Sequence, residues 1–310
     1  MTTTTDLPKL TASRLRDAKA CQRLHHYKYG LGYRPLAEGT ALRFGKLVHD
    51  GLEAWWEGAG EERLDAALAA IAQPEADPFD QAKAEAMLRG YHARWCDQQF
   101  RVVGVEVPFE TELVNPDTGK PSRTWTLAGK IDAIVEVDGK CMIVEHKTTS
   151  EDMSAGSAYW ARLRLDQQIS IYYAGAASLG LKVDGAIYDV LGKPGQKPLK
   201  TNSRRQVDES PLEYRDRVIE AIAEEPNAYF ARAEVVRLEA EMSEGMADVW
   251  QLGRMLREND ARGFHPRTVE ACTRFGTCPF FAVCCGEASL DDTNKFRRLT
   301  ELHPELASAA

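Results

Sequence analysis

The chain has 310 residues, a net charge of −8 and a hydrophobic content of 44%. This length is ample for a real core, and no apolar run reaches the roughly 18 residues that a membrane-spanning helix needs. The first residues, MTTTTDLPKL, lack the basic and apolar regions of a signal peptide. We therefore expect a cytoplasmic protein without a membrane partner. Any nucleic-acid-binding face has to be local, because the overall charge is acidic.

The first third of the chain predicts helices. Residues 11–31 predict one helix that begins at a Thr or Ser cap and ends near Gly30, and residues 43–57 predict a second. From 61 to 98 the pattern is again helical, with a break at PEADPFD. His49 and Glu53 are four residues apart, so they share one face of the second helix. Glu53 either supports a metal site or is a solvated helix residue.

Strands dominate the middle of the chain. Alternating and β-branched residues predict strands at 102–114, 124–137, 140–148 and 185–191, and a helix is predicted over about 160–179. Further helices are predicted at about 210–226 and 240–259. This order indicates a mixed α/β core with helical elaborations at both ends. We expect a single domain over 1–305, with a helical insertion at about 55–100.

The stretch GKIDAIVEVDGKCMIVEHKTT (129–149) predicts a hairpin with a two-residue turn at Asp138-Gly139. Counting back from that turn places Asp132 opposite Glu145, and a period of two puts Lys147 on the same face as Glu145. Two opposed carboxylates repel each other unless a cation lies between them, so a divalent metal is indicated. The alternative is a solvated sheet edge in which Lys147 pairs with a carboxylate.

The seven cysteines are not expected to form disulfides in a reducing compartment. Cys96 and Cys141 stand alone in apolar surroundings and are expected to be core residues. The remaining five occur at the two ends of the chain: Cys21, Cys272, Cys278, Cys284 and Cys285. Cys272, Cys278 and Cys284 are separated by five residues each, whereas zinc sites usually contain a closer pair. A 4Fe-4S cluster, zinc and unligated thiols all remain open for these residues.

A loop at 192–207, GKPGQKPLKTNSRRQV, contains five basic residues and no acidic one. It is either a DNA-binding segment that follows a phosphate backbone or a solvated loop. Its basic residues are Lys193, Lys197, Lys200, Arg204 and Arg205.

Four motifs, in order along the chain, resemble the PD-(D/E)XK nuclease superfamily. They are GKLVHDGLE (45–53), GKID (129–132), EHK (145–147) and QISIY (168–172). The resemblance covers most of the chain and is strongest to the RecB-like branch with an iron-sulfur staple, which includes CRISPR-associated adaptation exonucleases and phage relatives. It implies a restriction-endonuclease-like mixed β-sheet flanked by helices, with the ends at 11–31 and 260–290 joined by a metal cluster. Ile131 replaces the proline of the family motif and leaves its aspartate in place.

The resemblance implies roles for residues around the hairpin. Asp132 and Glu145 would hold Mg²⁺ or Mn²⁺, and His49 with the main-chain carbonyl of His146 would complete the ligands. Lys147 would position the attacking water and stabilise charge on the phosphate.

It also implies roles for residues outside the hairpin. Gln168 and Tyr172 would contact the substrate or organise the site, the alternative being a buried tyrosine with a polar neighbour. Cys21, Cys272 and Cys278, with Cys284 or Cys285, would ligate a 4Fe-4S cluster, and zinc is the less favoured alternative.

The function implied by the resemblance is a metal-dependent DNA nuclease. We expect an exonuclease that acts on DNA ends or single strands in recombination, repair, or CRISPR or phage DNA processing, with recombination or CRISPR adaptation proteins as partners. The alternative is a non-catalytic nucleic-acid-binding or structural subunit of such a complex. Retention of His49, Asp132, Glu145 and Lys147 favours the enzyme, because a binding module does not need all four.

Overall fold

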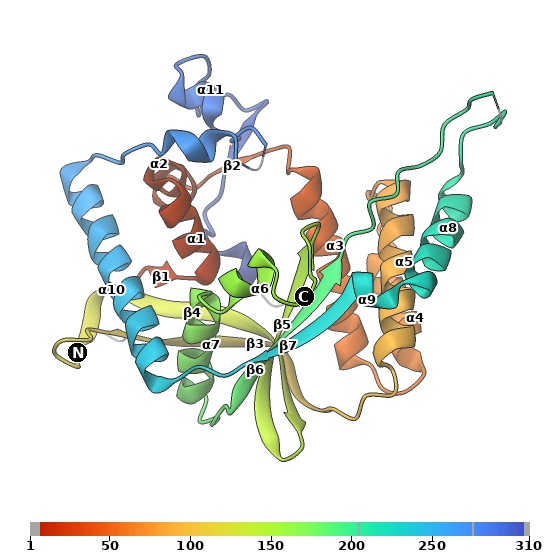
Figure 1. The fold of residues 1–310 in the computed structure, drawn as a ribbon. Coiled ribbons are helices and arrows are strands. Elements are labelled where there is room, and N and C mark those ends of the chain that lie inside the picture. The colour runs from red at the N-terminus through yellow and green to blue at the C-terminus, as the bar shows by residue number, and fades with distance from the viewer. Residues whose placement is uncertain (1–6, 204, 275, 307–310) are drawn as a thin grey trace.

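The computed structural model describes residues 7–306 except 204 and 275, and it has a mixed six-stranded sheet with helices on both faces (Figure 1). The strand order is β1-β4-β5-β6-β7, with β3 paired to β4. The strands are β1 (Lys9–Leu10), β3 (Arg101–Val114), β4 (Pro121–Val137), β5 (Lys140–Thr149), β6 (Gly185–Gly192) and β7 (Phe230–Val235). β5 and β6 are parallel, whereas β3-β4, β4-β5 and β6-β7 are antiparallel. The predicted α/β class with a mixed central sheet is confirmed.

Helices cover the sheet in two groups, each with its own apolar core. One core joins the sheet to α3 (Thr40–Glu57), α4 (Glu62–Ile71), α5 (Pro78–Trp95) and α8 (Pro211–Glu224). The other joins it to α1 (Ala12–Ala20), α7 (Gln167–Ser178) and α10 (Glu239–Arg262). The apolar stripe of α3 is buried as its 3.6-residue period requires. None of the helices in the described ranges is long and apolar enough to cross a membrane.

Two predicted helices are interrupted. The helix predicted over 11–31 breaks at Cys21, whose backbone is extended, and continues as α2 (Gln22–His25) and a π-helix (His26–Gly30). The helix predicted over 160–179 is divided into α6 (Ala158–Leu163) and α7, because the Asp166 side chain accepts from Gln168 N and caps a new helix. Both breaks lie beside functional candidates.

Several short elements have no strong sequence pattern and were not predicted. They are β1, β7, α9 (Pro226–Tyr229), α11 (Phe281–Cys284), two 3₁₀ turns (Val269–Cys272 and Pro304–Leu306), and the small sheet of β2 (Tyr33–Pro35) with β8 (Phe296–Arg298). Strands this short are defined by the partner that they pair with, and β2 and β8 are about 260 residues apart in the chain.

The hairpin turn has the predicted geometry. Asp138 and Gly139 have φ values of 50° and 75°, as a two-residue turn with two left-handed positions requires. Val137 pairs with Lys140, and the register holds back to Ala133 opposite Val144. Asp132 and Glu145 are therefore the next residues on the two strands.

β4 and β5 separate at that point. Beyond Val144, β5 pairs only with β6, while the same edge of β4 pairs with β1 at Thr126 and Leu127. Residues 128–132 of β4 thus lie in a gap between β1 and β5. This fork gives side chains room to face each other where a regular ladder would place backbone hydrogen bonds.

Candidate active site

Asp132 and Glu145 lie at the fork between β4 and β5. Asp132 Oδ2 accepts a hydrogen bond from His146 N at 2.8 Å, which replaces a ladder bond. Glu145 is only 2% exposed, and its Oε2 has no hydrogen-bond partner among the described residues. Burial, and next the negative charge of Glu106, raise the pKa of Asp132 to about 7. Burial, and next Asp132, raise the pKa of Glu145 to about 8. Two adjacent carboxyls are thus held in an environment that opposes their ionisation.

Lys147 joins these carboxylates to α7. Its Nζ donates to Glu145 Oε1 at 2.6 Å and to Gln168 Oε1 at 2.7 Å. Gln168 Nε2 in turn donates to the Tyr172 hydroxyl at 2.7 Å. Burial alone would lower the pKa of Lys147, but Glu145 and Asp166 raise it above its ordinary value. Gln168 and Tyr172 therefore fix the position of the ammonium group, and one of its three N–H donors is left for a further acceptor.

The fit between α7 and the sheet depends on a glycine of the GKID motif. Phe109 packs so closely on Gly129 that a Cβ there would lie 2.6 Å from the Phe109 ring. The same ring makes an edge contact with Tyr172, with ring centroids 6.0 Å apart. Gly129 thus lets α7 approach the sheet closely enough for Gln168 to reach Lys147.

The two histidines of the predicted metal site come from different elements. His49 of α3 and His146 of β5 make an edge contact, with ring centroids 6.3 Å apart. Burial, and next His146 and Lys147, lower the pKa of His49 to about 3, so its imidazole is neutral. The neutral form is the one that binds metals.

The side chain of His146 points away from the carboxylates. Its Nδ1 lies 3.2 Å from Asp189 Oδ2 on β6. Asp189 accepts from Arg232 Nε at 2.8 Å and from the Tyr91 hydroxyl. Arg232 opposes the effect of burial and holds the pKa of Asp189 well below its usual range. This buried network holds β5, β6, β7 and α5 together behind the fork. Only the main-chain carbonyl of His146 remains a ligand candidate.

Glu106 is a site residue that the sequence interpretation missed. It lies on β3 between Val105, which pairs with Ala133, and Val107, which pairs with Ile131, so it faces Asp132. Its φ of 49° is unusual for a residue with a side chain. Its carboxylate pairs with Lys130 at 2.5 Å. The one available signal was an isolated acid in an apolar strand, VVGVEVPF.

A cavity of about 350 Å³ opens beside Lys147 and Gln168, between α1 and α7. Arg16 and Lys19 of α1 and Arg274 of the cysteine-rich segment also line it. These basic residues were not among the predicted site residues, because only packing brings three distant segments together. Four basic side chains, Lys147 included, outnumber the one acidic residue of this lining, Asp166, and such an environment suits a phosphate group.

The donor set at the fork suits a hard divalent cation. It offers carboxylate oxygens, a neutral imidazole and a buried unpartnered carboxylate oxygen. In the described chain the ligand atoms of His49, Asp132 and Glu145 do not all lie within 4.8 Å of one another. The two carboxylates repel each other, and a cation between them would remove that repulsion.

A model of the PD-(D/E)XK nuclease superfamily matches residues 9–285, a span that contains every residue of the fork. The chain belongs to the PD-(D/E)XK nuclease superfamily. Among solved structures, the crystal structure of SSO0001 is 16% identical, with a TM-score of 0.33, over 78% of this chain and 84% of that one. A protein from Eubacterium rectale, named as a candidate exonuclease, is 12% identical, with a TM-score of 0.46, over 87% and 89%. Curated proteins give no match.

This PD-(D/E)XK chain brings four cysteines to one cavity. Cys21, Cys272, Cys278 and Cys284 line a space of about 390 Å³, whereas Cys285 does not line it and is exposed. Burial is the largest cause of the raised pKa of Cys278; a backbone hydrogen bond with Phe280 opposes it, and the other three thiols add to it. Throughout the described ranges no three of these sulfurs lie within 4.8 Å of one another. A single zinc ion binds each thiolate at about 2.3 Å, so its sulfur ligands would lie closer together than 4.8 Å. A 4Fe-4S cluster binds each thiolate through a different iron, which allows a wider separation of the sulfurs.

Cys96 and Cys141 are only partly buried, so the prediction of core residues is wrong for Cys96 and holds in part for Cys141, which packs against an apolar core. Cys96 follows the last turn of α5, and Cys141 is next to the hairpin turn. At these positions solvent reaches one side of an otherwise apolar element.

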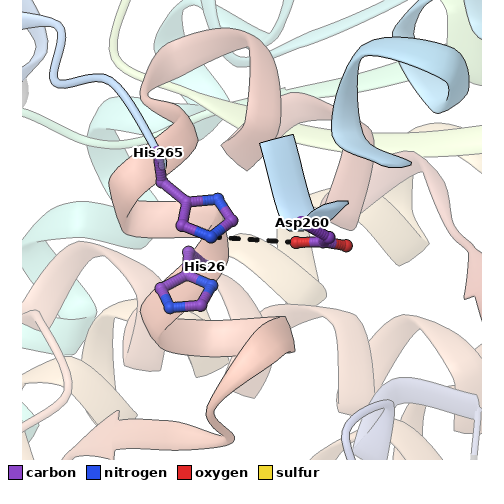
Figure 2. A group of neighbouring side chains, drawn as sticks. All are labelled: His26, Asp260 and His265. Carbon is purple, nitrogen blue, oxygen red and sulfur yellow. Dashed lines mark ion pairs between the residues drawn. The ribbon is translucent and has the colours of Figure 1, made fainter. Parts of the chain in front are cut away.

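A third group with metal-ligand chemistry in this PD-(D/E)XK chain consists of His26, Asp260 and His265 (Figure 2). The two imidazoles are stacked, with centroids 3.6 Å apart and planes 12° apart, and His265 Nε2 lies 3.8 Å from Asp260 Oδ1. The lone pair of an imidazole nitrogen lies in the plane of its ring. Because these two rings are stacked in parallel, their lone pairs do not converge on one point, and an ion between them would lie out of both ring planes and bind poorly. Burial is the first factor that lowers the pKa of both histidines. We interpret the group as a neutral histidine stack that packs the π-helix after α2 against the end of α10.

The predicted DNA-binding loop leaves the core as an extended arm between β6 and α8 (Figure 1). Two of its cations are neutralised, because Lys200 pairs with Asp208 at 3.0 Å and Arg205 with Glu213 at 2.9 Å. Lys197 is exposed. Lys193 lies over the Phe44 ring and contributes to the lowered pKa of His49, so it is nearest the fork. Arg204 lies outside the described residues.

Proposed function

We propose that the chain is a divalent-metal-dependent deoxyribonuclease that hydrolyses phosphodiester bonds at DNA ends or in single strands. The observation that carries this proposal is the contact of Lys147 Nζ with both Glu145 and Gln168 at a fork that also holds Asp132. A lysine held in this way between a carboxylate pair and a basic cavity matches the needs of phosphoryl chemistry better than those of a binding surface.

Asp132, Glu145, His49 and the carbonyl of His146 would hold Mg²⁺ or Mn²⁺. When bound, such an ion supplies a more acidic water and polarises a phosphate oxygen. Lys147 uses its remaining N–H donor to orient the attacking water or to bind a non-bridging phosphate oxygen. Water adds to phosphorus, the P–O ester bond breaks, and the proton lost by the water ends on the leaving oxygen or in solvent.

The substrate would enter through the cavity beside Lys147. Arg16, Lys19 and Arg274 would bind the phosphates on either side of the scissile bond. Gln168 and Tyr172 keep Lys147 aligned without direct contact with the substrate. This assigns Gln168 and Tyr172 to organising the site, one of the two roles that the sequence resemblance allows.

We also propose that Cys21, Cys272, Cys278 and Cys284 ligate a 4Fe-4S cluster. The large cavity and the separation of the sulfurs support this choice over zinc. A cross-link between Cys21 and the 272–284 segment closes a loop of about 250 residues and would restrict the unfolded chain strongly. The role of the cluster would be to hold α1 and Arg274 beside the cavity that contains Lys147. The pathway and any recombination or CRISPR adaptation partners remain predictions from the sequence resemblance.

The test uses end-labelled single-stranded and double-stranded DNA with Mn²⁺, Mg²⁺ or EDTA, followed over time on denaturing gels. Wild type should shorten labelled strands only with metal. Lys147→Ala should abolish cleavage while the protein still folds, as circular dichroism would show, because it removes one member of a group that acts as a unit. Lys140→Ala, an exposed lysine on the same strand, is the matched control. Binding without cleavage by wild type would support the non-catalytic alternative.

A further inference from the structure

A second basic surface lies between the β3–β4 hairpin and α10. It surrounds a cavity of about 290 Å³, and no acidic side chain lines it. We call its four charged residues the basic pocket: Lys120, Arg123, Arg254 and Arg257. In a chain with a net charge of −8, such a concentration of positive charge is a local exception.

The charges of the basic pocket are not neutralised within the part of the chain that the structure describes. All four side chains are exposed. None of them has an ion pair among the described residues, and Arg254 donates only to the neutral amide of Gln251 at 3.4 Å. The arm between β6 and α8 differs, because its Lys200 and Arg205 are paired with carboxylates. Because no counter-charge neutralises these four cations within the described residues, they can attract an external anion.

The basic pocket is built on rigid elements. Trp250, Arg254 and Arg257 follow the three- and four-residue spacing of one helix face. Trp125 Nε1 of β4 donates to Gly253 O at 3.0 Å and ties the hairpin to α10. A Cβ at Gly253 would lie 3.2 Å from Trp125, so this close approach requires a small residue. Trp250 is partly exposed at the pocket and offers an aromatic face beside the cations. Basic grooves with aromatic rings are typical of surfaces that bind single strands.

The basic pocket lies along the strand that carries Asp132. Trp125 lines the pocket, and a step of seven residues along β4 leads from it to Asp132. At about 3.3 Å per residue the separation is about 23 Å, the length of about seven nucleotides of a stacked strand with the B-form rise of 3.4 Å. We propose that the basic pocket binds the phosphodiester backbone of the nucleic-acid substrate about seven nucleotides from the scissile bond. This inference rests on the proposed nuclease function, and it adds a contact that neither the superfamily match nor the fork provides.

Binding measured without metal tests the basic pocket separately from catalysis. The variant Arg254→Gln/Arg257→Gln removes two exposed charges, and Lys140→Gln/Lys182→Gln removes two exposed charges elsewhere. Fluorescence anisotropy with a labelled 30-nucleotide strand in EDTA gives Kd at several salt concentrations. For single strands each phosphate contact contributes about 0.7 to the slope of log Kd against log salt concentration. The pocket variant lacks two contacts, so its slope should be smaller by about 1.4 and its binding about 25-fold weaker at 0.1 M salt. The control variant should change little.

Substrate length tests where the basic pocket acts. With Mn²⁺, the loss of kcat/KM in the pocket variant should be several-fold larger for a 30-nucleotide strand than for a 6-nucleotide strand, which is too short to reach from the fork. Equal losses at both lengths would overturn the proposed position. A duplex of the same sequence distinguishes a double-stranded ligand from a single-stranded one by its steeper slope, about 0.9 per contact.

The remaining outcomes separate this inference from the proposed function. Wild-type affinity and salt slope in the pocket variant, with cleavage intact, would overturn the basic pocket and leave the nuclease assignment standing. Weaker binding in the pocket variant, with no metal-dependent cleavage by wild type, would support the pocket and overturn the nuclease assignment.

Discussion

Replacing Asp132 with asparagine tests whether the carboxylates at the fork are held together for a cation. The asparagine amide keeps an oxygen for the 2.8 Å bond from His146 N. It removes the negative charge of Asp132, which faces Glu106 and which raises the pKa of Glu145 in wild type. Without metal we therefore expect Asp132→Asn to be more stable than wild type. A structural aspartate would give the opposite result.

The magnitude follows from the pKa of Asp132, which burial and Glu106 raise from 3.8 to about 7. Each pKa unit corresponds to about 1.4 kcal/mol, which gives an upper bound of about 4 kcal/mol above pH 7. Pairwise repulsion across strands gives a lower bound of about 0.2–1 kcal/mol. Because the folded state keeps a proton that the unfolded state releases, wild-type stability falls as pH rises from about 4 to about 7. The advantage of Asp132→Asn should grow over this window and vanish below it.

Urea unfolding of wild type and Asp132→Asn, in EDTA and in Mn²⁺, measures these differences. Mn²⁺ at one hundred times its Kd should stabilise wild type by about 2.7 kcal/mol and the variant by much less, because one ligand is weakened. Asp97→Asn, the same substitution at an exposed position, controls for the loss of one charge. A variant that is less stable than wild type in EDTA, and that gains as much from Mn²⁺, would refute a metal role for this pair.

Three other predictions concern separate parts of the chain. Gln168→Ala should lower kcat about 10- to 100-fold, by analogy with residues that orient the ligands of a metal site. Tyr172→Phe should lower kcat less, because Gln168 would still reach Lys147. Steady-state kinetics of both variants test these expectations. Cys278→Ser should abolish the broad absorbance near about 400 nm of anaerobically purified protein, whereas Cys285→Ser should keep this absorbance. A metal analysis that finds zinc without iron or labile sulfide would contradict the cluster. Arg232→Met should lower the free energy of unfolding in urea by about 3–5 kcal/mol, because it leaves the Asp189 carboxylate buried without its cation. A loss below about 1 kcal/mol would show that solvent reaches the network around Asp189.

Local patterns in the sequence determined the elements that carry the site. The Asp138-Gly139 turn fixed the register of β4 and β5, and with a side-chain period of two this placed Asp132 and Glu145 together. The apolar stripe of α3 likewise predicted the helix that carries His49, whereas the role of His49 came from the family resemblance. These features depend on neighbours within a few residues, so a sequence is enough to predict them.

Only the tertiary structure decided how distant segments meet. It separated β4 from β5 beyond Val144, placed Glu106 against Asp132, and brought Arg16 and Arg274 to the cavity beside Lys147. It also neutralised part of the basic arm that the sequence singled out, and gathered at the basic pocket cations from segments that lie about 130 residues apart. The physical reason is that such contacts depend on the packing and close approach of whole helices and strands, and the residue pattern of one segment carries no record of which partner it will face.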